Sequence, residues 1–419
     1  MRRSALAAMC VAVACGGRPA PPAVPMAALP PIQAATLIRV GVAVDRDSVL
    51  VGATQDFSVL TGDSAAIGTG SAGAPWTARP GGVGRLILRD WQGVERDVAS
   101  GVIVRPVTDG YVTIGSRRYR GEAWIIRGTA GVTVINRVTI EDYLMSVVAL
   151  ELGFRAPSDR EAVKAQAVAA RTYVARYRGR REALGFDVYA TDADQVYTGI
   201  DSEFPEVADA VRATTGEILT YGGRPIQALF HSTCGWSTES IEQVWLNSAP
   251  VPYLQAVSDR SGDGPDDYYC RISPRFRWRE EWTGDALASM LARTLPAAVG
   301  TPIPDLGRLT DVRVGRTSPT GRAAELVVSS TTGTWSVPSY RIREVLRTSA
   351  GSQLLSTLFQ LYVERQRDGA VSKLVAAGAG YGHGVGMCQF GAVGRARAGQ
   401  DYRTILAAYY QGTTLERAY

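Results

Sequence analysis

The chain has 419 residues, 46% of them hydrophobic, which is enough to bury the core of one large domain or of two smaller ones. Its net charge is +5, and because Lys164 and Lys373 are the only lysines, almost all of the positive charge is arginine. Apart from a cluster between residues 176 and 181 the arginines are scattered, with no basic tract interleaved with aromatic residues, which argues against nucleic-acid binding and leaves an anionic polymer as a compatible partner.

The N-terminus predicts export. Two arginines precede an apolar run that is too short to cross a bilayer as a helix, and this pattern is typical of a secretory signal peptide over residues 1–14. The residues before Cys15 resemble a bacterial lipobox, although Ala12 stands where leucine is usual. We expect lipidation of Cys15 and a tether over residues 15–36, with an ordinary cleaved signal as the alternative. Under both alternatives the mature protein is expected outside the cytoplasm. If Cys15 is lipidated, the lipid would anchor the protein to the bacterial membrane.

Residues 37–136 are predicted to form a β-rich part. Short runs of alternating hydrophobic residues are separated by clusters of Gly, Asp and Ser, and no segment of helical periodicity interrupts them. The clearest strands are predicted at residues 37–44, 86–90, 102–107 and 132–136. Residues 62–84, rich in Gly, Ala and Ser, are predicted to form a loop.

A first helix is predicted from residue 139. Thr139 and Asp142 make a capping box just before an apolar run. Gly153 ends the helix, and Pro157 blocks its continuation.

A carboxylate interrupts the apolar face of this helix. Leu144, Val147 and Val148 lie on one face, and the position seven residues after Leu144, where another hydrophobic residue is expected, is Glu151. Burial there would raise the pKa of the carboxyl group towards the range where it donates and accepts a proton near neutral pH. The alternative is that Glu151 lies at the fraying end of the helix and reaches solvent or pairs with Arg155.

A second helix is predicted to begin at a capping box formed by Ser158 and Glu161. One side carries a stripe of small residues, which lets another element approach closely and is more typical of packing than of a site. Gln166 and Arg171 are the polar exceptions along this stripe, which ends at Tyr173.

The rest of the chain is predicted to mix helices and strands. Helices are expected at residues 206–214, 285–294, 340–346, near 392, and 402–410. Strands are expected at residues 311–314, 324–329 and 334–337, and a hairpin is expected in which residues 218–221 and 225–231 flank two glycines. A Gly-rich loop is expected at residues 378–386.

Both histidines lie near cysteines. His231 precedes Cys234, His383 precedes Cys388, and Cys270 is the third cysteine of the mature chain. A zinc site would draw on His231, Cys234, Cys270 and Cys388, since imidazole and thiolate suit zinc. An extracytoplasmic compartment also permits a Cys234–Cys270 disulfide, and three buried free thiols are the third alternative. No CxxC pair supports zinc by spacing, so the three alternatives stay open.

Several long motifs occur in a fixed order along the chain. They are YLMSVVALEL followed by EAVKAQAVAARTY, DQVYTG at 194–199, TTGEILTYGGRPIQALFHSTCG at 214–235 and YGHGVGMCQFGAVGRARAG at 381–399. Together they resemble the stage II sporulation protein D (SpoIID)/LytB family over roughly residues 38–419. The resemblance implies one SpoIID/LytB-type domain over residues 37–419.

We therefore expect an α+β fold. Its parts are a β-rich part at 37–136, a catalytic core with the helix pair at 137–260, an α+β insertion at 261–375, and a C-terminal Gly-rich loop and helix at 376–419.

The resemblance also implies an activity. In that family the glutamate matching Glu151 is the catalytic acid/base of a peptidoglycan lytic transglycosylase, a lyase that cuts between N-acetylmuramic acid and N-acetylglucosamine and leaves a 1,6-anhydro end. This chemistry needs one carboxyl group rather than the two of ordinary glycoside hydrolysis. Family members with this activity prefer glycan strands already stripped of stem peptides. Candidate substrate-binding residues are Gln166, Arg171, Tyr173, Tyr197, His383 and Gln389.

Two other functions are alternatives to the transglycosylase. The LytB branch enhances a separate N-acetylmuramoyl-L-alanine amidase and need not be catalytic, which would make this chain a binding module. A zinc-dependent hydrolase built on the His/Cys positions is the third hypothesis. The expected partners are peptidoglycan strands and an amidase, without nucleic acid and with the membrane reached only through the lipid. No cofactor is required, although some family members bind zinc, so a structural zinc is compatible.

Overall fold

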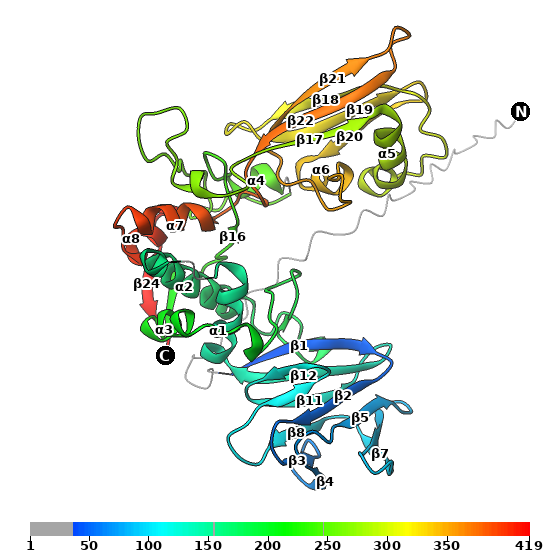
Figure 1. The fold of residues 1–419 in the computed structure, drawn as a ribbon, viewed down its shortest axis with the longest axis vertical. Coiled ribbons are helices and arrows are strands. Elements are labelled where there is room, and N and C mark those ends of the chain that lie inside the picture. Colours follow the sequence, from blue (N-terminus) through cyan, green and yellow to red (C-terminus); the bar gives the residue numbers. More distant parts are fainter. Residues whose placement is uncertain (1–36, 154–155, 246) are drawn as a thin grey trace, which may run out of the picture.

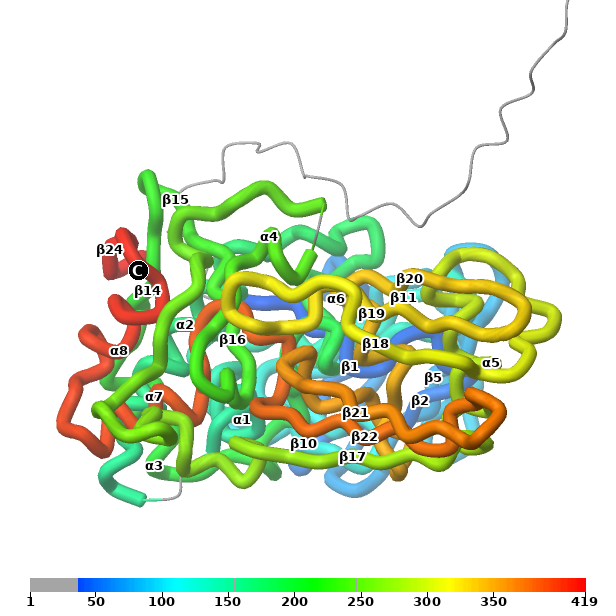
Figure 2. The backbone as a smooth tube through the Cα atoms, turned by 90° about the horizontal axis from the view of Figure 1, so that it is seen from above, coloured from blue at the N-terminus to red at the C-terminus, as the bar shows by residue number. Residues whose placement is uncertain are grey.

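The computed structural model describes residues 37–153, 156–245 and 247–419, so the predicted signal peptide, Cys15 and the tether lie outside the described residues. A helical centre carries two lobes, an N-terminal β-rich lobe and a second lobe built from later residues (Figure 1). Seen from above, both lobes extend from the same side of this centre, one over the other (Figure 2). The fold is α+β, as predicted. Within the described ranges, no helix is long and apolar enough to span a membrane.

The N-terminal lobe contains two sheets. The seven-stranded sheet runs in the order β13-β1-β12-β11-β8-β3-β4. Its strands are β1 (Leu37–Arg46), β3 (Phe57–Leu60), β4 (Ala66–Gly70), β8 (Val102–Pro106), β11 (Glu122–Arg127), β12 (Val132–Thr139) and β13 (Val188–Tyr189). The six-stranded sheet runs in the order β10-β9-β2-β5-β6-β7. Its strands are β2 (Val49–Ala53), β5 (Trp76–Pro80), β6 (Arg85–Arg89), β7 (Glu95–Ala99), β9 (Val112–Ile114) and β10 (Arg117–Tyr119).

The predicted loop at residues 62–84 contains the strands β4 and β5. The glycines that suggested a loop are packing positions. A Cβ atom on Gly70 would lie 2.1 Å from the ring of Phe57, and one on Gly68 would lie 2.7 Å from the ring of Trp76. Small residues are required where the strand crosses these buried rings, so the composition of the segment misled the prediction.

The helical centre follows directly from β12. Its helices are α1 (Ile140–Glu151), α2 (Arg160–Tyr177), α3 (Pro205–Ala213), the short α4 (Ile241–Val244), α7 (Gln389–Arg397) and α8 (Tyr402–Tyr409). The predicted cap of α1 is present, because the Thr139 hydroxyl oxygen accepts a hydrogen bond from the backbone N–H of Asp142 at 3.1 Å. The small residues of α2 are buried against α1, α3, α7 and α8.

The second predicted capping box does not form. A 3-10 turn, Pro157–Asp159, precedes α2, whose N-terminus has no side-chain cap. Glu161 instead pairs with Lys164 at 2.6 Å and accepts a hydrogen bond from the backbone N–H of Tyr402 at 3.0 Å. A tertiary contact with α8 therefore replaces the local one.

The second lobe has its own hydrophobic core. One three-stranded sheet consists of β17 (Arg277–Thr283), β22 (Val371–Ala379) and β21 (Phe359–Arg365), and another of β18 (Leu309–Thr317), β19 (Ala323–Ser330) and β20 (Thr334–Pro338). Two helices pack on these sheets, α5 (Gly284–Val299) and α6 (Ser339–Val345). The predicted helices and the strands β18 to β20 are confirmed, whereas β17, β21 and β22 were not predicted.

Two small sheets join the C-terminal residues to the helical centre. One consists of β15 (Arg224–Pro225), β14 (Glu217–Tyr221) and β24 (Thr414–Arg417). The predicted hairpin turns at Gly222 and Gly223, which both have positive φ. Its second arm is shorter than the predicted 225–231, because only Arg224 and Pro225 pair with β14. The other sheet pairs β16 (Phe230–His231) in parallel with β23 (Met387–Cys388), so that His231 lies opposite Cys388.

Candidate active site

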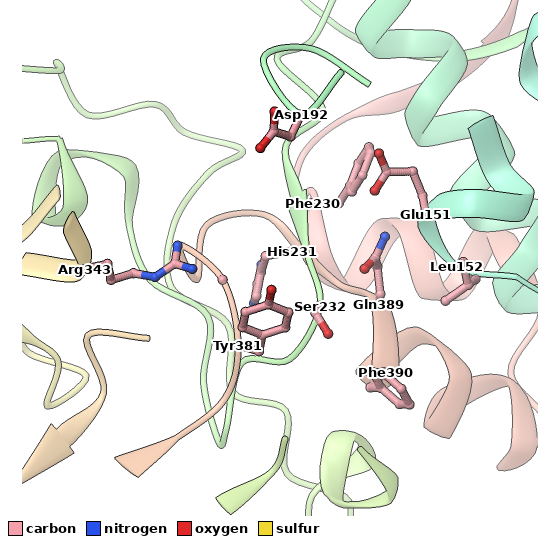
Figure 3. Close-up of a pocket in the computed structure, with 11 residues that line it drawn as sticks. Glu151, Leu152, Asp192, Phe230, His231, Ser232, Arg343, Tyr381, Gln389 and Phe390 are labelled. Atoms are coloured by element: carbon pink, nitrogen blue, oxygen red, sulfur yellow. The ribbon is translucent and has the colours of Figure 1, made fainter. Parts of the chain in front are cut away.

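A pocket of about 450 Å³ lies at the C-terminal end of α1, beside β16 and residues of the second lobe (Figure 3). The residues that form it are far apart in the sequence. They are Glu151, Leu152, Asp192, Phe230, His231, Ser232, Arg343, Tyr381, Gly382, Gln389 and Phe390.

Glu151 is the last residue of α1, and its side chain is half-buried in the pocket wall. Burial is the largest influence on the pKa of Glu151 and raises it. Hydrogen bonds from the Val196 backbone N–H, at 3.4 Å, and from the Gln389 side chain act in the opposite direction. The net effect is a raised pKa, so this carboxyl group holds its proton to a higher pH than an ordinary glutamate, as a general acid requires. The alternative partner Arg155 lies outside the described residues.

Gln389 and Gln166 form a buried pair behind Glu151. The Gln389 amide nitrogen Nε2 donates to Oε1 of Gln166 at 3.4 Å. Gln389 lines the pocket, whereas Gln166 is fully buried and does not. Of the two predicted sugar-binding glutamines, the structure therefore brings only Gln389 to the pocket, and Gln166 orients it.

The two histidines have different surroundings. His231 is buried in the pocket wall, where its Nδ1 lies 3.2 Å from the carbonyl oxygen of Val385. A carbonyl only accepts, so Nδ1 carries the proton and Nε2 is an acceptor, which has no partner among the described residues. His383 packs behind His231, with ring centroids 5.5 Å apart, and hydrogen-bonds to the backbone of Phe230 and Val385. Burial lowers the pKa of His231 well below its ordinary value and that of His383 to about 4. Both imidazole rings are therefore neutral near pH 7.

Arg343 extends from α6 of the second lobe, and its side chain faces the pocket from the side opposite Glu151 (Figure 3). Its Nε donates to the carbonyl oxygen of Leu354 at 2.6 Å. Within the described part of the chain, no carboxylate pairs with its guanidinium group. Burial, followed by the nearby Arg322 cation, lowers the pKa of Arg343, since both disfavour the charged form of its guanidinium group. No pattern in the sequence had singled out Arg343.

Asp192 and Tyr381 also line the pocket and were missed. Asp192 is exposed and adds a second carboxyl group to the lining, and Tyr381 is 43% exposed. Asp192 lies two residues before the start of the DQVYTG motif, and this proximity was the one local signal that pointed to it.

Residues 129–221, which contain α1 and α2, match the family model described as stage II sporulation protein (SpoIID). A stage II sporulation protein D of Bacillus subtilis (strain 168) is 30% identical over 299 residues, which cover 68% of this chain and 76% of that protein. This chain belongs to the SpoIID family.

Two further relatives extend the comparison. An uncharacterized protein of Brachyspira hyodysenteriae is 32% identical to this SpoIID-family chain over 321 residues, 75% of this chain and 76% of the relative. An amidase enhancer of Bacillus subtilis (strain 168) is 32% identical over 278 residues, 61% of this chain and 38% of that protein. Residues 263–386 match a domain of unknown function, DUF8618. The pocket therefore combines Glu151 from the SpoIID match with Arg343 and Tyr381 from the second match.

Arg171, a predicted substrate-binding residue of this SpoIID-family chain, does not reach the pocket. Its side chain is fully buried and binds the Glu141 carboxylate with two hydrogen bonds of 2.9 and 2.7 Å. It also donates to the carbonyl oxygens of Val211 and Glu217. These contacts join α2 to α1, to α3 and to the start of β14, which is a packing role.

Tyr173 and Tyr197 do not line the pocket either. The Tyr173 hydroxyl donates to Asp194 at 3.1 Å, and its ring packs on Tyr177. The Tyr197 hydroxyl donates to Asn136 at 2.8 Å, within the core. Both motif tyrosines shape the core next to the pocket, which is the packing alternative that the sequence left open.

A buried cluster of sulfur and oxygen atoms lies next to the pocket wall. The cysteine cluster consists of Cys234, Asp259, Cys270 and Cys388, whose ligand atoms all lie within 4.8 Å of one another. All three cysteines of the described residues are free thiols. Asp259, which the sequence did not single out, takes the position in the cluster that was predicted for His231.

Proposed function

We propose that this SpoIID-family chain cleaves peptidoglycan glycan strands between N-acetylmuramic acid and N-acetylglucosamine by lytic transglycosylation, with Glu151 as general acid and base. The observation that carries the proposal is the half-buried Glu151 carboxyl group, with its raised pKa, in the wall of an open pocket. Membership of the SpoIID family, together with a relative named amidase enhancer, supports a role at the cell wall.

The reaction needs one proton and returns it. Protonated Glu151 donates to the glycosidic oxygen, and the bond from C1 of the muramoyl unit to that oxygen breaks, with its electron pair staying on the leaving N-acetylglucosamine. The Glu151 carboxylate then removes the proton of the muramoyl C6 hydroxyl as O6 bonds to C1. Glu151 ends protonated, no water is consumed, and the new end is a 1,6-anhydro ring.

Three neighbours support this chemistry. Gln389, held by Gln166, hydrogen-bonds to Glu151 and fixes its orientation, and this bond favours the carboxylate that forms after the first proton transfer. His231 offers an unpartnered acceptor, Nε2, to a sugar hydroxyl. Its Nδ1 bond to Val385 holds the ring in the tautomer that makes Nε2 an acceptor.

Arg343 favours a peptide-stripped glycan as the substrate. Removal of the stem peptide by an amidase leaves a free lactyl carboxylate on N-acetylmuramic acid, whereas an attached peptide converts that carboxylate to a neutral amide. Arg343 faces the pocket without a carboxylate partner among the described residues. A guanidinium group binds carboxylates through charge-assisted hydrogen bonds, so a stripped muramoyl unit supplies the missing anion.

The proposal is tested with purified, peptide-stripped glycan strands and mass analysis of the products. A transglycosylase releases fragments that end in an anhydro-muramoyl unit, lighter by one water than hydrolysis fragments. Hydrated, reducing ends would contradict transglycosylation and would point to hydrolysis with Asp192 as the second carboxylate.

The competing function is amidase enhancement, which the named relative supports. In that case the wild-type chain leaves stripped strands intact but accelerates an added N-acetylmuramoyl-L-alanine amidase on peptide-bearing peptidoglycan. The same preparation is therefore assayed on both substrates, and amidase acceleration without strand cleavage would replace the first proposal.

A further inference from the structure

The cysteine cluster brings together three segments of the chain. Cys234 follows β16, Cys270 lies in the 3-10 turn Tyr269–Ile272, and Cys388 ends β23. Asp259 precedes that turn and joins them, and all four residues are buried. We propose that Cys234, Asp259, Cys270 and Cys388 bind one zinc ion in a structural site.

The distances suit zinc. Tetrahedral zinc with bonds of about 2.3 Å to sulfur and about 2.1 Å to oxygen places two sulfur ligands about 3.8 Å apart, and sulfur and oxygen about 3.6 Å apart. The Sγ atoms of Cys234 and Cys270 are 3.4 Å apart, and Sγ of Cys234 lies 3.6 Å from Oδ2 of Asp259. Only small shifts are needed to accommodate the ion, because no pair of ligand atoms is farther apart than 4.8 Å.

Surrounding groups hold two of the ligands in orientation. Sγ of Cys388 accepts backbone hydrogen bonds from Cys234 at 3.1 Å and from Gly391 at 3.2 Å, which suits a thiolate. The Tyr409 hydroxyl donates to Oδ1 of Asp259 at 2.6 Å. Oδ2 lies on the side of the cysteines, where it accepts from the Cys270 N–H at 3.0 Å. Such outer hydrogen bonds are typical of built metal sites.

Two buried arginines balance the charge. Three thiolates, one carboxylate and a zinc ion together carry two negative charges. Arg395 lies 3.5 Å from the Asp259 carboxylate. Arg322 donates to the carbonyl oxygen of Cys234 at 2.7 Å, and its Nε and Nη1 have no hydrogen-bond partner among the described residues. The negative charge of the zinc-bound site would stabilise the buried Arg322 guanidinium group, because burying a cation without a nearby anion is energetically unfavourable.

The site is structural rather than catalytic. Four protein ligands close the coordination of zinc, whereas a catalytic zinc keeps one position for water or substrate. The ligands are close in sequence to the pocket wall, since His231 precedes Cys234 by three residues and Gln389 follows Cys388 directly. Zinc would therefore fix the two segments that carry these pocket residues. The inference does not depend on the proposed activity, because zinc content is measured in inactive protein as well.

Metal content and disulfide mapping test the inference on the mature chain, purified without chelator or reductant. We expect one zinc ion per chain and no disulfide. A Cys234–Cys270 disulfide, or three free thiols without metal, would overturn the proposal. The absorption spectrum of wild-type protein with cobalt in place of zinc tests for cysteine ligands directly, because a thiolate bound to cobalt produces a sulfur-to-metal charge-transfer band. Absence of this band would also contradict it.

Variants separate the proposed ligand set from the one expected from sequence. Asp259→Asn should weaken zinc binding roughly tenfold or more, whereas His231→Asn and the exposed control Asp263→Asn should keep it. Loss of zinc in His231→Asn with retention in Asp259→Asn would refute Asp259 as a ligand. If Asp259→Asn does not fold, the cobalt spectrum of the wild type compared with His231→Asn decides whether histidine is a ligand.

Discussion

At the scale of single residues, Glu151 is subject to opposing influences. Burial raises its pKa, while the hydrogen bonds from Val196 and Gln389 lower it. A general acid must be protonated, so its contribution to the rate is present below its pKa and is lost as the pH rises through that value. We therefore expect an alkaline limb in the pH profile of kcat/KM that lies above the ordinary glutamate pKa.

Replacing Gln389 by methionine should move this limb. The variant keeps the approximate size but removes a hydrogen bond that favours the carboxylate, so the pKa of Glu151 rises further and the alkaline limb shifts to higher pH. The measurement is kcat/KM for strand cleavage against pH, with the exposed Gln92→Met as control. A limb that stays in place or moves to lower pH would contradict this role of Gln389.

The residues of the pocket differ in how far the sequence predicted them. Glu151 was noticed because it interrupts a hydrophobic stripe, which is a local signal, but its catalytic role was inferred from the resemblance to the SpoIID/LytB family. Arg343 is one arginine among many on helices and strands, and only the packing of the second lobe brings it to Glu151. Asp259 joins the cysteines through long-range contacts that no spacing in the sequence indicates.

At the scale of elements, a buried ion pair joins the helices around the pocket. Arg171 of α2 is fully buried, and Glu141 of α1 has a side chain that is 20% exposed. Removing one partner of a buried pair leaves the other uncompensated, which is strongly destabilising.

Arg171→Met should lower the free energy of unfolding by ~3 kcal/mol, because Glu141 stays partly buried without its cation. The exposed Arg160→Met, at the start of the same helix, should change little. Urea unfolding measures both variants. Unchanged stability of Arg171→Met together with lost cleavage would instead restore Arg171 as a substrate-binding residue.

The helices also show which elements a sequence can predict. The cap at Thr139 depends on residues within one turn and forms as predicted. The box at Ser158 and Glu161 fails because Glu161 binds α8, which is more than two hundred residues away in the sequence. Similarly, β4 was missed because its glycines are explained only by the rings of Phe57 and Trp76 above them.

At the scale of the whole molecule, the pocket depends on both the helical centre and the second lobe. Glu151 comes from the former and Arg343 from the latter, on opposite sides of the pocket (Figure 3). The second lobe has its own core, so it presents Arg343 on a packed scaffold rather than on an unsupported loop. We infer that this lobe contributes to the choice of substrate.

Arg343→Met should lower kcat/KM on peptide-stripped strands by roughly ten- to a hundredfold, since a hydrogen bond to a charged group contributes about 1.5–3 kcal/mol. Strands that keep their stem peptides lack the free carboxylate, so the variant should change their slower cleavage little. Arg341→Met, on the same helix but outside the pocket, is the matched control. An equal loss on both substrates would contradict recognition of the lactyl carboxylate.

The most direct test of the central claim compares Glu151→Gln with wild type on stripped glycan strands by mass analysis. The amide keeps the size of the side chain but transfers no proton, and general acid/base groups contribute roughly 10²–10⁴-fold in rate. We predict anhydro-muramoyl products from wild type and from the exposed control Glu206→Gln, and a loss of cleavage of that size in folded Glu151→Gln. Anhydro products formed by Glu151→Gln at the wild-type rate would contradict the account.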